Sequence, residues 1–523
     1  MTATKPVTND SSAGPVEIRL STGAVRGRRE AVRGGVVAFR GVPYGVSEGR
    51  FGVPRGCAAW GGVLAADGDV GTVPWQPVSP VGALMGDPAP GVQTEECLTV
   101  NVWAPEPGEG PRPVLVWLPG GNFLTGGADL PRYDGAELAA QERIVVVVVN
   151  HRLGALGFLA PEWAGPAELV GSGAGVDFKA TSGSGYVTNA GLLDQIAALR
   201  WVKNEVRAFG GDPERITVAG QSSGAQGLAA LLALPQVRPL FRRAVLHSPP
   251  LAGTAPGREE AAETAARFLD AAGVRDPEGL RALPAERILA AQQQTGPRFG
   301  PVVDGAVVLA PDPLEALRAA PPLDGVDVLT GVTRNECALW LGLSDNPAHA
   351  TREGALDVFR ARFGERAEEA LDRYVATAVA VRDVLPTAVE DLQSDTAFAV
   401  PTQRLAATLH ALGARTRLYR FDWQVPGRNA ALRACHCLDV AFLLGGEQAR
   451  RAPLLADADP AETASLRRRM RALWGEYVRT GLPAPEDEWP AYDPAAPAVR
   501  VVGGDLDGVV LRSLLEPGRV GLW

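Results

Sequence analysis

Basic charge is scarce in this sequence compared with what a nucleic-acid-binding protein needs. The 523 residues include 51 Lys and Arg against 60 Asp and Glu, which gives a formal net charge of -9 and a pI near 5.3. Such a chain offers no basic field to a phosphate backbone. We therefore expect no nucleic-acid partner.

Long hydrophobic segments are also missing. The longest purely aliphatic run, Ile144–Val149, is far shorter than the roughly 20 residues that cross a bilayer as a helix, and it is typical of a strand buried on both faces. Residues 1–13 are polar and rich in Ser and Thr, without the apolar core of a secretory signal. These absences predict a cytoplasmic protein with no membrane segment.

Cysteine is infrequent and odd in number. A large chain without a signal segment and with an odd cysteine count favours reduced thiols over a disulfide framework. The five cysteines are Cys57, Cys97, Cys337, Cys435 and Cys437.

No low-complexity linker, internal repeat or long charge run divides the chain. Apolar residues make up 46% and charged residues 21%, a composition that supports a sizeable folded core. We expect one catalytic domain over residues 1–523, with residues 1–15 flexible. Two segments with Ala, Leu, Glu and Arg at helical spacing, 255–320 and 345–412, are expected to be helical insertions.

Strand-like and helix-like segments alternate along the chain. An antiparallel hairpin is expected from Val16–Arg28 and Gly35–Arg40, and a helix over Leu192–Phe209 ends at Gly210-Gly211. Pro161–Val187, rich in Gly, Ser and Ala, is expected to form a long surface loop. The expected core strands are Val114–Leu118, Ile144–Val149, Ile216–Ala219, Arg242–Leu246, Val326–Thr330 and Arg417–Phe421. This order predicts an α/β fold: a large, mostly parallel central sheet with helices on both faces.

A nucleophile-elbow pattern follows one of these strands. Gly220-Gln221-Ser222-Ser223-Gly224 comes directly after Ile216–Ala219. A strand that turns at once into a helix leaves little room for Cβ atoms near the serine, so glycines are needed on both sides. The pattern predicts that Ser222 is a nucleophile.

A serine nucleophile needs a histidine base and a carboxylate that orients it. Of five histidines in the chain, His436 lies just beyond the last expected core strand, and Glu336 lies just beyond Val326–Thr330. The chain order Ser, Glu, His, each after a strand, is that of α/β-hydrolases.

With these residues in place, the chain resembles the type-B carboxylesterases, the cholinesterase-like branch of the α/β-hydrolases, almost from end to end. The matching stretches are Phe39-Arg40-Gly41-Val42-Pro43-Tyr44, Arg50-Phe51, Glu95-Glu96-Cys97-Leu98-Thr99-Val100-Asn101-Val102, Asn150-His151-Arg152-Leu153-Gly154, Asn189-Ala190-Gly191-Leu192-Leu193-Asp194-Gln195, Phe209-Gly210-Gly211-Asp212-Pro213 and Trp489-Pro490-Ala491-Tyr492. The resemblance implies an α/β-hydrolase fold with helical insertions over the active site. It also implies the triad Ser222, Glu336 and His436.

The resemblance further assigns the groups around the triad. The oxyanion hole is expected from the backbone N–H of Ser223 and from a loop where the family carries His-Gly-Gly-Gly and this chain reads Pro119-Gly120-Gly121-Asn122. Gly121 and Asn122 would supply its other donors. Ser248 would support the hydrogen bonding of the acid, and Phe123 and Leu124 would line the pocket.

Two departures from the family pattern concern sulfur. The partner that secreted members pair with the cysteine at the position of Cys97 is missing here. Cys435 and Cys437 flank His436, and Cys337 follows Glu336. Small apolar packing is the ordinary role of such residues; a redox-sensitive bridge is an alternative hypothesis, which thiol titration of native and oxidised protein tests.

The function expected from the sequence is a serine hydrolase that cleaves a small-molecule carboxylic ester through an acyl-enzyme. Cys435-His436-Cys437 lacks the spacing of a zinc site, and no phosphate-binding loop or Gly-x-Gly-x-x-Gly is present, so no metal and no cofactor are expected. Two alternatives stay open: an acyltransferase or cyclase that uses the same acyl-enzyme, and a non-catalytic binding homologue. A monomer or homodimer is expected.

Overall fold

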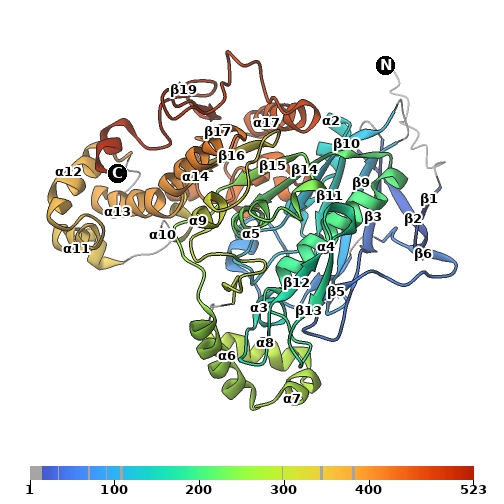
Figure 1. Ribbon diagram of the computed structural model, residues 1–523. Coiled ribbons are helices and arrows are strands. Elements are labelled where there is room, and N and C mark those ends of the chain that lie inside the picture. Colours follow the sequence, from blue (N-terminus) through green and yellow to red (C-terminus); the bar gives the residue numbers. More distant parts are fainter. Residues whose placement is uncertain are drawn as a thin grey trace, which may run out of the picture.

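The computed structural model describes residues 14–523 apart from 33–34, 69–70, 90, 107–109, 297–298, 342–345 and 380–382. The segment expected to be flexible is residues 1–15. Its first 13 residues lie outside the described part of the chain. The arrangement of helices around a central sheet is shown in Figure 1.

A 13-stranded sheet forms the centre of the molecule, and it is the large, mostly parallel sheet that the sequence predicts. Parallel pairing runs from β11 through β10, β14, β15, β16 and β17 to β18. In spatial order the strands are β1 (Val16–Leu20), β2 (Gly23–Glu30), β3 (Val36–Pro43), β9 (Thr99–Pro105), β11 (Val145–Val149), β10 (Arg112–Leu118), β14 (Gly211–Gln221), β15 (Arg243–His247), β16 (Asp327–Thr333), β17 (Arg415–Phe421), β18 (Val499–Val502) and β19 (Val510–Leu511), with β6 (Val63–Ala65) beside β2.

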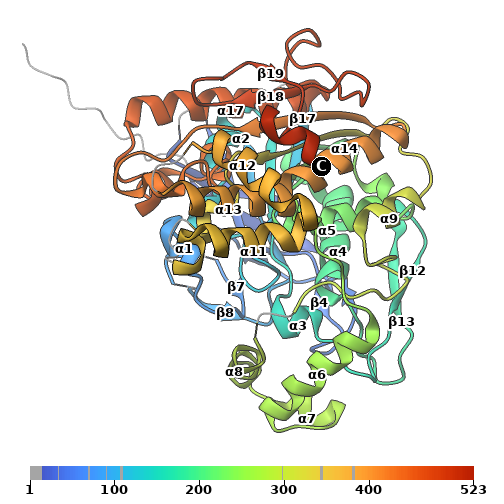
Figure 2. The same ribbon diagram turned by 90° about the vertical axis from the view of Figure 1, so that its left-hand side faces the viewer.

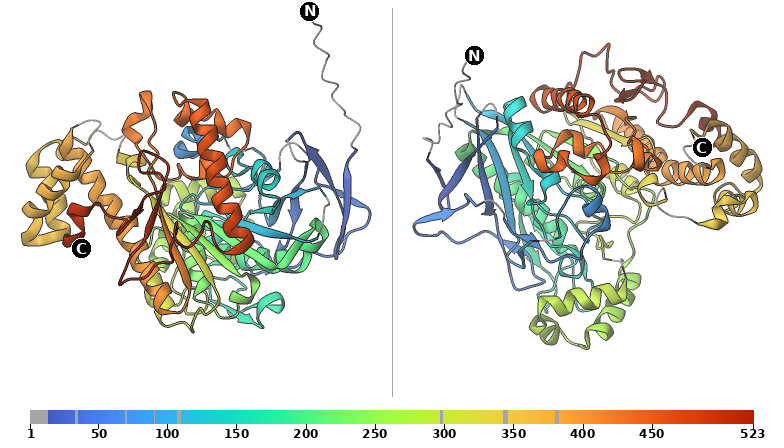
Figure 3. Two further views of the ribbon diagram at one scale, coloured as in Figure 1. Left: turned by 90° about the horizontal axis from the view of Figure 1, so that it is seen from above. Right: turned by 180° about the vertical axis from the view of Figure 1, so that it is seen from behind.

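Both faces of this sheet are buried, because side chains alternate between two hydrophobic clusters along each central strand. In β10, Val114 and Val116 pack in one cluster, whereas Leu115 and Trp117 pack in the other. The first cluster includes α4 (Ala190–Glu205) and α5 (Ser223–Leu232), which lie in front of the sheet in Figure 1. The second includes α2 (Ala136–Glu142) and α17 (Pro460–Thr480); Figure 3 shows α17, in orange-red, across the sheet.

The remaining helices form two groups beyond the sheet, which Figure 2 shows well apart. One group, in light green, is α6 (Arg258–Ala272), α7 (Pro277–Ala282) and α8 (Ala285–Thr295). The other is α11 (Arg352–Phe363), α12 (Ala367–Thr377), α13 (Val384–Ser394) and α14 (Val400–Ala411). The C-terminal 3-10 helix Pro517–Leu522 packs against α12. Shorter helices are α1 (Pro80–Leu84), α3 (Gly154–Phe158), α9 (Pro313–Arg318), α10 (Ala338–Leu341), α15 (Val440–Leu443) and α16 (Glu447–Arg450).

The prediction of a long surface loop over Pro161–Val187 was wrong. The segment contains the antiparallel strands β12 (Ala167–Val170) and β13 (Asp177–Ala180). Its apolar residues, such as Phe178 and Tyr186, are buried in the first cluster. Two further small sheets pair β4 (Val46–Ser47) with β5 (Pro54–Arg55), and β7 (Val73–Pro74) with β8 (Gln93–Thr94).

Candidate active site

The serine of the elbow pattern lies on a strained turn between a strand and a helix. β14 ends at Gln221, α5 begins at Ser223, and Ser222 between them has φ 55° and ψ -124°. Positive φ in a residue with a side chain is uncommon and is often found at functional turns. A Cβ on Gly224 would overlap the carbonyl oxygen of Leu118, and one on Gly220 would collide with the backbone of Gly224. Both glycines of the pattern are therefore required by close backbone approach.

Glu336 and His436 form a buried pair on two adjoining loops. Nδ1 of His436 lies 2.5 Å from Oε2 of Glu336, and both side chains are nearly inaccessible to solvent. Oε1 of Glu336 accepts a hydrogen bond from the amide of Thr333 at 2.8 Å. The loops themselves are joined, because the amide of His436 donates to the carbonyl of Glu336 and that of Asn335 to the carbonyl of Ala434. This geometry fixes the ring orientation of His436.

The other ring nitrogen of His436 faces a residue that the sequence did not single out. Nε2 lies 3.0 Å from the side-chain nitrogen of Gln221, the neighbour of Ser222. Within the described residues, no hydrogen bond joins Ser222 to His436. The only signal available in the sequence was the position of Gln221 inside the elbow motif.

The surroundings of His436 favour its protonated form. Burial alone would lower the pKa of the imidazole, but the Cys437 sulfur and the Glu336 carboxylate, through charge and hydrogen bonds, raise this pKa well above its ordinary value. Cys437 itself has φ 70°, so its backbone is held in the left-handed region next to the ring. A base that is charged near neutrality becomes competent only as the pH rises.

The loop after β10 has the geometry of an anion-binding turn. Gly121, Asn122 and Phe123 have φ of 132°, 57° and 57°. The amide of Phe123 donates to Oγ of Ser223 at 3.2 Å, which ties the loop to the start of α5. Among the described residues, the backbone N–H groups of Gly121, Asn122 and Ser223 have no acceptor. Unpaired N–H groups beside a helix N-terminus suit a developing negative charge.

A cavity of about 450 Å³ opens beside this loop. Asn122 and Phe123 line it, together with Phe158, Phe299 and Gln226. Leu124, also expected in the pocket, is not a lining residue of this cavity and packs against the first hydrophobic cluster. Phe123 lies in ring contact with Phe158, at a centroid distance of 5.0 Å.

The hydrogen bond expected from Ser248 to the acid is not formed. Its hydroxyl is buried and has no partner among the described residues, and its amide donates instead to the carbonyl of Gly331. The amide of Thr333 takes over the expected support of Glu336.

Comparisons with known proteins show the family of this chain. The model of the carboxylesterase family matches residues 14–168 and 176–505. The chain belongs to the carboxylesterase family. It is an enzyme that hydrolyses esters, so the alternative of a non-catalytic binding homologue is set aside. Its α/β-hydrolase fold is that of solved carboxylesterases, as the sequence predicted.

Several relatives cover nearly the whole of this carboxylesterase. The phenmedipham hydrolase of Pseudarthrobacter oxydans is 33% identical over 93% of this chain and 95% of its own, and the para-nitrobenzyl esterase of Bacillus subtilis is 32% identical over 90% and 91%. The solved carboxylesterase of Geobacillus stearothermophilus shares 34% identity over 95% of this chain and 97% of its own, with a TM-score of 0.76.

Helix α13 holds the loops of Glu336 and His436 from one side. Oγ of Ser394 accepts the amide of Cys337 at 2.9 Å, and Asp391 accepts the Asn335 side chain at 3.4 Å, so α13 contacts both neighbours of Glu336. Arg433, three residues before His436, pairs with Asp391 at 2.8 Å and with Glu390.

These contacts involve fully buried charges. Burial alone would raise the pKa of Asp391, but the guanidinium groups of Arg433 and Arg519 hold it below its usual range. Arg433 has φ 48°, a conformation that only strong local contacts maintain in such a residue. Removing one partner from a buried ion pair is strongly destabilising. The loops of Glu336 and His436 are thus anchored to α13 at three points.

A second buried histidine lies under the elbow. Nδ1 of His247 lies 2.8 Å from Asp439, and the indole N–H of Trp474 donates to Nε2 at 3.0 Å. Because an indole nitrogen can only donate, Nε2 of His247 is the acceptor of this hydrogen bond. The carbonyl of His247 accepts the amide of Ser222 at 2.9 Å. This histidine therefore supports the turn at Ser222.

All five cysteines lie in the described part of the chain and are free thiols. Burial, followed by the charge of Glu336, raises the pKa of Cys337 to about 12, and burial raises that of Cys435 well above its ordinary value. Thiols that stay protonated are poor nucleophiles in disulfide exchange, which counts against a ready bridge at these positions.

The described residues form neither a metal-binding cluster nor a membrane-spanning helix. No group of three or more His, Cys, Asp or Glu side chains is arranged to hold a metal ion. None of the helices is both long and apolar enough to pass through a lipid bilayer.

Proposed function

We propose that this carboxylesterase is a serine hydrolase that forms an acyl-enzyme on Ser222, with His436 as the base and Glu336 as its orienting acid. The observation that carries the proposal is the buried contact of 2.5 Å between Nδ1 of His436 and Oε2 of Glu336, next to the strained elbow at Ser222. A charge-assisted pair of this length fixes the tautomer and stabilises the imidazolium that proton transfer creates.

The reaction begins when Oγ of Ser222 attacks the ester carbonyl carbon. Its proton passes to Nε2 of His436, while the carbonyl oxygen takes the negative charge and accepts hydrogen bonds from the N–H groups of Gly121, Asn122 and Ser223. His436 then protonates the departing alcohol, and the acyl group stays on Ser222. Water, deprotonated by His436, attacks the acyl-enzyme and releases the acid.

One adjustment is needed before this sequence starts. Nε2 of His436 faces Gln221 at 3.0 Å, so the ring must exchange this contact for Oγ of Ser222. Catalytic hydrogen bonds often tighten only when substrate is bound. The 450 Å³ cavity beside Asn122 and Phe123 is largely aromatic on one side and suits one of the two organic groups of a small-molecule ester.

The proposal is tested with Ser222→Ala. We expect turnover of p-nitrophenyl acetate to fall on the order of 10⁶-fold and fluorophosphonate labelling to disappear. Ser172→Ala changes an exposed loop serine of the same chain and should keep both. Labelling of Ser222→Ala at the wild-type rate would refute the assignment. Product analysis with added alcohols or amines then separates hydrolysis from acyl transfer.

A further inference from the structure

The C-terminal segment, residues 513–523, packs against the group of helices that contains α13. Its 3-10 helix Pro517–Leu522 contacts α12, and Figure 1 shows the C-terminus beside α12 and α13. Leu522 is buried among side chains of α11, α12 and α13, and the indole N–H of Trp523 donates to the hydroxyl of Tyr374 at 3.2 Å. Apolar packing and a hydrogen bond thus hold the end of the chain on these helices.

Arg519 is the buried cation of this segment. Its Nε donates to the hydroxyl of Thr377 at 2.7 Å, and its Nη2 donates to Oδ2 of Asp391 at 2.8 Å. The guanidinium carbon lies 4.4 Å from the centre of the Tyr374 ring, and Nη1 lies 3.5 Å from Asp395. Because these partners belong to α12, to α13 and to the π-helical turn after α13, the position of Arg519 is fixed from three sides.

Asp391 divides its two carboxylate oxygens between the C-terminal segment and the loops of the buried pair. Oδ2 faces Arg519, whereas Oδ1 accepts hydrogen bonds from Nη2 of Arg433 at 2.8 Å and from the side-chain nitrogen of Asn335 at 3.4 Å. Arg433 and Asn335 lie on the two loops that carry the imidazole and the carboxylate of the buried pair. A carboxylate is planar, so the group that binds Oδ2 also affects where Oδ1 and both loops lie.

A second contact joins the C-terminal segment to the loop of Glu336. Oε1 of Glu516 lies 3.0 Å from Nη2 of Arg334 and 3.2 Å from Nη1 of Arg420. Arg334 precedes Glu336 by two residues, and Arg420 lies in β17. Two charged residues of the segment, three positions apart, therefore bind groups that belong to the two loops or contact them.

The charges around Asp391 remain paired when one partner is removed. Arg433 also pairs with Glu390, and Arg519 also lies 3.5 Å from Asp395. Removing one partner of a buried ion pair is strongly destabilising because it leaves an uncompensated charge. Without Arg519, Asp391 keeps Arg433 as its partner. Its carboxylate is then drawn toward Arg433, which changes the contact with the loop of that arginine.

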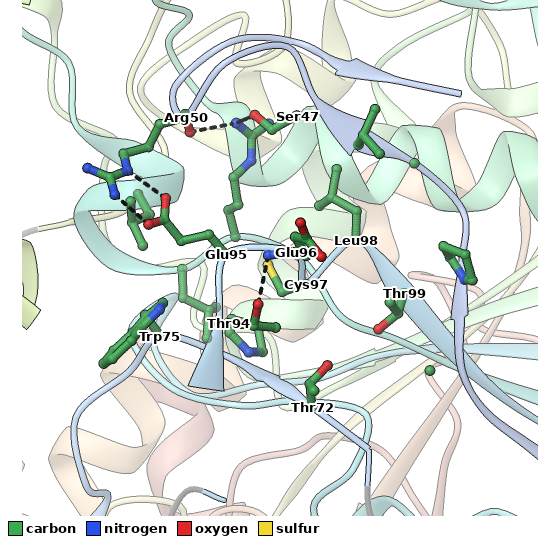
Figure 4. Close-up of a pocket in the computed structure, with 18 of the residues that line it drawn as sticks. Ser47, Arg50, Thr72, Trp75, Thr94, Glu95, Glu96, Cys97, Leu98 and Thr99 are labelled. Atoms are coloured by element: carbon green, nitrogen blue, oxygen red, sulfur yellow. Dashed lines mark hydrogen bonds and ion pairs between the residues drawn. The ribbon is translucent and has the colours of Figure 1, made fainter. Parts of the chain in front are cut away.

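Arg519 lies away from the cavities where an organic group of an ester could bind. It lines neither the 450 Å³ cavity beside Asn122 nor the cavity of about 710 Å³ around Arg50 and Glu95 that Figure 4 shows. The space that it does line, together with Arg433 and others, has a volume of about 20 Å³, which is room for one water molecule. A change at Arg519 should therefore act on the reaction and leave substrate binding nearly unchanged.

We propose that Arg519 is a positioning residue of the esterase reaction, which keeps the two loops of the buried pair together by holding Asp391. Arg519 touches neither the substrate nor the reacting atoms and acts through Asp391. When its guanidinium is lost, Asp391 turns toward Arg433 and the imidazole is held less firmly for proton transfer. This inference rests on the proposed roles of Glu336 and His436.

Arg519→Met tests this role, because it keeps much of the side-chain volume and removes the guanidinium. Kinetics with p-nitrophenyl acetate are expressed per active serine, counted by fluorophosphonate titration, so that unfolded protein does not contribute. We expect kcat to fall about three- to thirtyfold and KM to stay within about twofold of the wild type. Arg512→Met changes an exposed arginine of the same segment and should alter neither constant.

A double-mutant cycle shows whether Arg519 acts through Asp391. Asp391→Asn alone should also lower kcat, because a neutral amide holds an arginine less strongly than a carboxylate does. If both residues act on the same contact, the combined variant should lose no more than the larger single loss. Arg519→Lys keeps the charge without the planar fork that binds Thr377 and Asp391 together, so its kcat should lie between those of Arg519→Met and the wild type.

The inference is overturned if kcat per active serine is that of the wild type in Arg519→Met, or in Arg519→Lys should only that variant fold. A combined loss equal to the product of the two single losses overturns it as well, because Arg519 and Asp391 then act independently. In both cases the proposed function still stands. If fluorophosphonate labels Ser222→Ala at the wild-type rate, the proposed function fails and this inference falls with it.

Discussion

The side-chain amide of Gln221 lies 3.0 Å from Nε2 of His436, on the side of the ring opposite Glu336. The imidazole of His436 is therefore held between one carboxylate and one neutral amide. The amide nitrogen can only donate, so it makes this contact with the unprotonated Nε2 of the neutral ring and positions the ring without stabilising the imidazolium.

Replacing that amide by a carboxylate should change the pH dependence of the enzyme. In Gln221→Glu, a negative charge beside Nε2 favours protonated His436 and raises its pKa further. Since the neutral ring is the proposed base, the acid limb of kcat/KM should move to higher pH. The measurement is the pH profile with p-nitrophenyl acetate.

Gln226→Glu is the control for added charge. It places a carboxylate on α5, the helix that follows the elbow, at a residue that lines the 450 Å³ cavity and forms no hydrogen bond with His436 among the described residues. Its acid limb should move much less. Equal shifts in the two variants would show that the contact with Gln221 does not set the protonation of His436.

The sulfur of Cys437 acts on the same pKa. Its interaction with the ring, together with that of Glu336, raises the pKa of His436 well above the ordinary value. In Cys437→Ala the pKa should fall, so the neutral base persists to lower pH and the acid limb of kcat/KM moves down. Cys57→Ala, a half-buried thiol elsewhere in the chain, should leave the profile unchanged. If the acid limb of kcat/KM does not move in Cys437→Ala, Cys437 does not raise the pKa of His436.

The anchoring of Glu336 by α13 predicts a stability effect coupled to activity. Ser394→Ala leaves the buried amide of Cys337 without its acceptor, which should lower the free energy of unfolding by about 1 to 3 kcal/mol. It should also lower kcat more than it changes KM, because the acid next to Cys337 is less well held. Urea unfolding and steady-state kinetics measure the two effects.

Thr396→Ala provides the comparison for this substitution. Its hydroxyl bonds only within its own helical segment, to the carbonyl of Leu392, so its kcat should stay close to that of the wild type. If kcat falls equally in both variants, destabilisation of this helical segment explains the result, and the contact of Ser394 with Cys337 does not position Glu336.

Local patterns in the sequence were sufficient to predict the central strands, the elbow and the partners of the buried pair. Buried parallel strands are continuous apolar runs, as in Ile144–Val149, and the glycines around Ser222 reflect close backbone contacts that any elbow requires. Glu336 and His436 each follow a strand, so chain order alone placed them at one edge of the sheet.

Contacts between distant side chains could not be predicted in this way. The turn of Gln221 toward His436 depends on rotamers across 215 positions of the chain. Arg433 and Asp391 meet only because α13 folds back over the loops. Pro161–Val187 has the composition of a loop. Its strands β12 and β13 could not be predicted from the sequence, because they depend on the packing of a few apolar residues against the first hydrophobic cluster.

Asn122 is the residue where this carboxylesterase's choice of ester can be tested most directly. Its backbone N–H is proposed to hold the oxyanion, whereas its side chain lines the 450 Å³ cavity. Asn122→Gly keeps the N–H and suits φ 57°. Its kcat/KM for p-nitrophenyl acetate should therefore stay within about threefold of the wild type, and kcat/KM for esters with bulkier groups should rise.

Asn122→Val separates the two roles of this residue. A β-branched side chain is disfavoured at positive φ, so the loop should shift and the N–H should leave its place. Activity should then fall on small and bulky esters alike, by roughly 100-fold or more if the donor is lost. Measuring kcat/KM for a series of esters of graded size distinguishes the two variants. If kcat/KM falls as far in Asn122→Gly as in Asn122→Val, the Asn122 side chain itself takes part in the reaction.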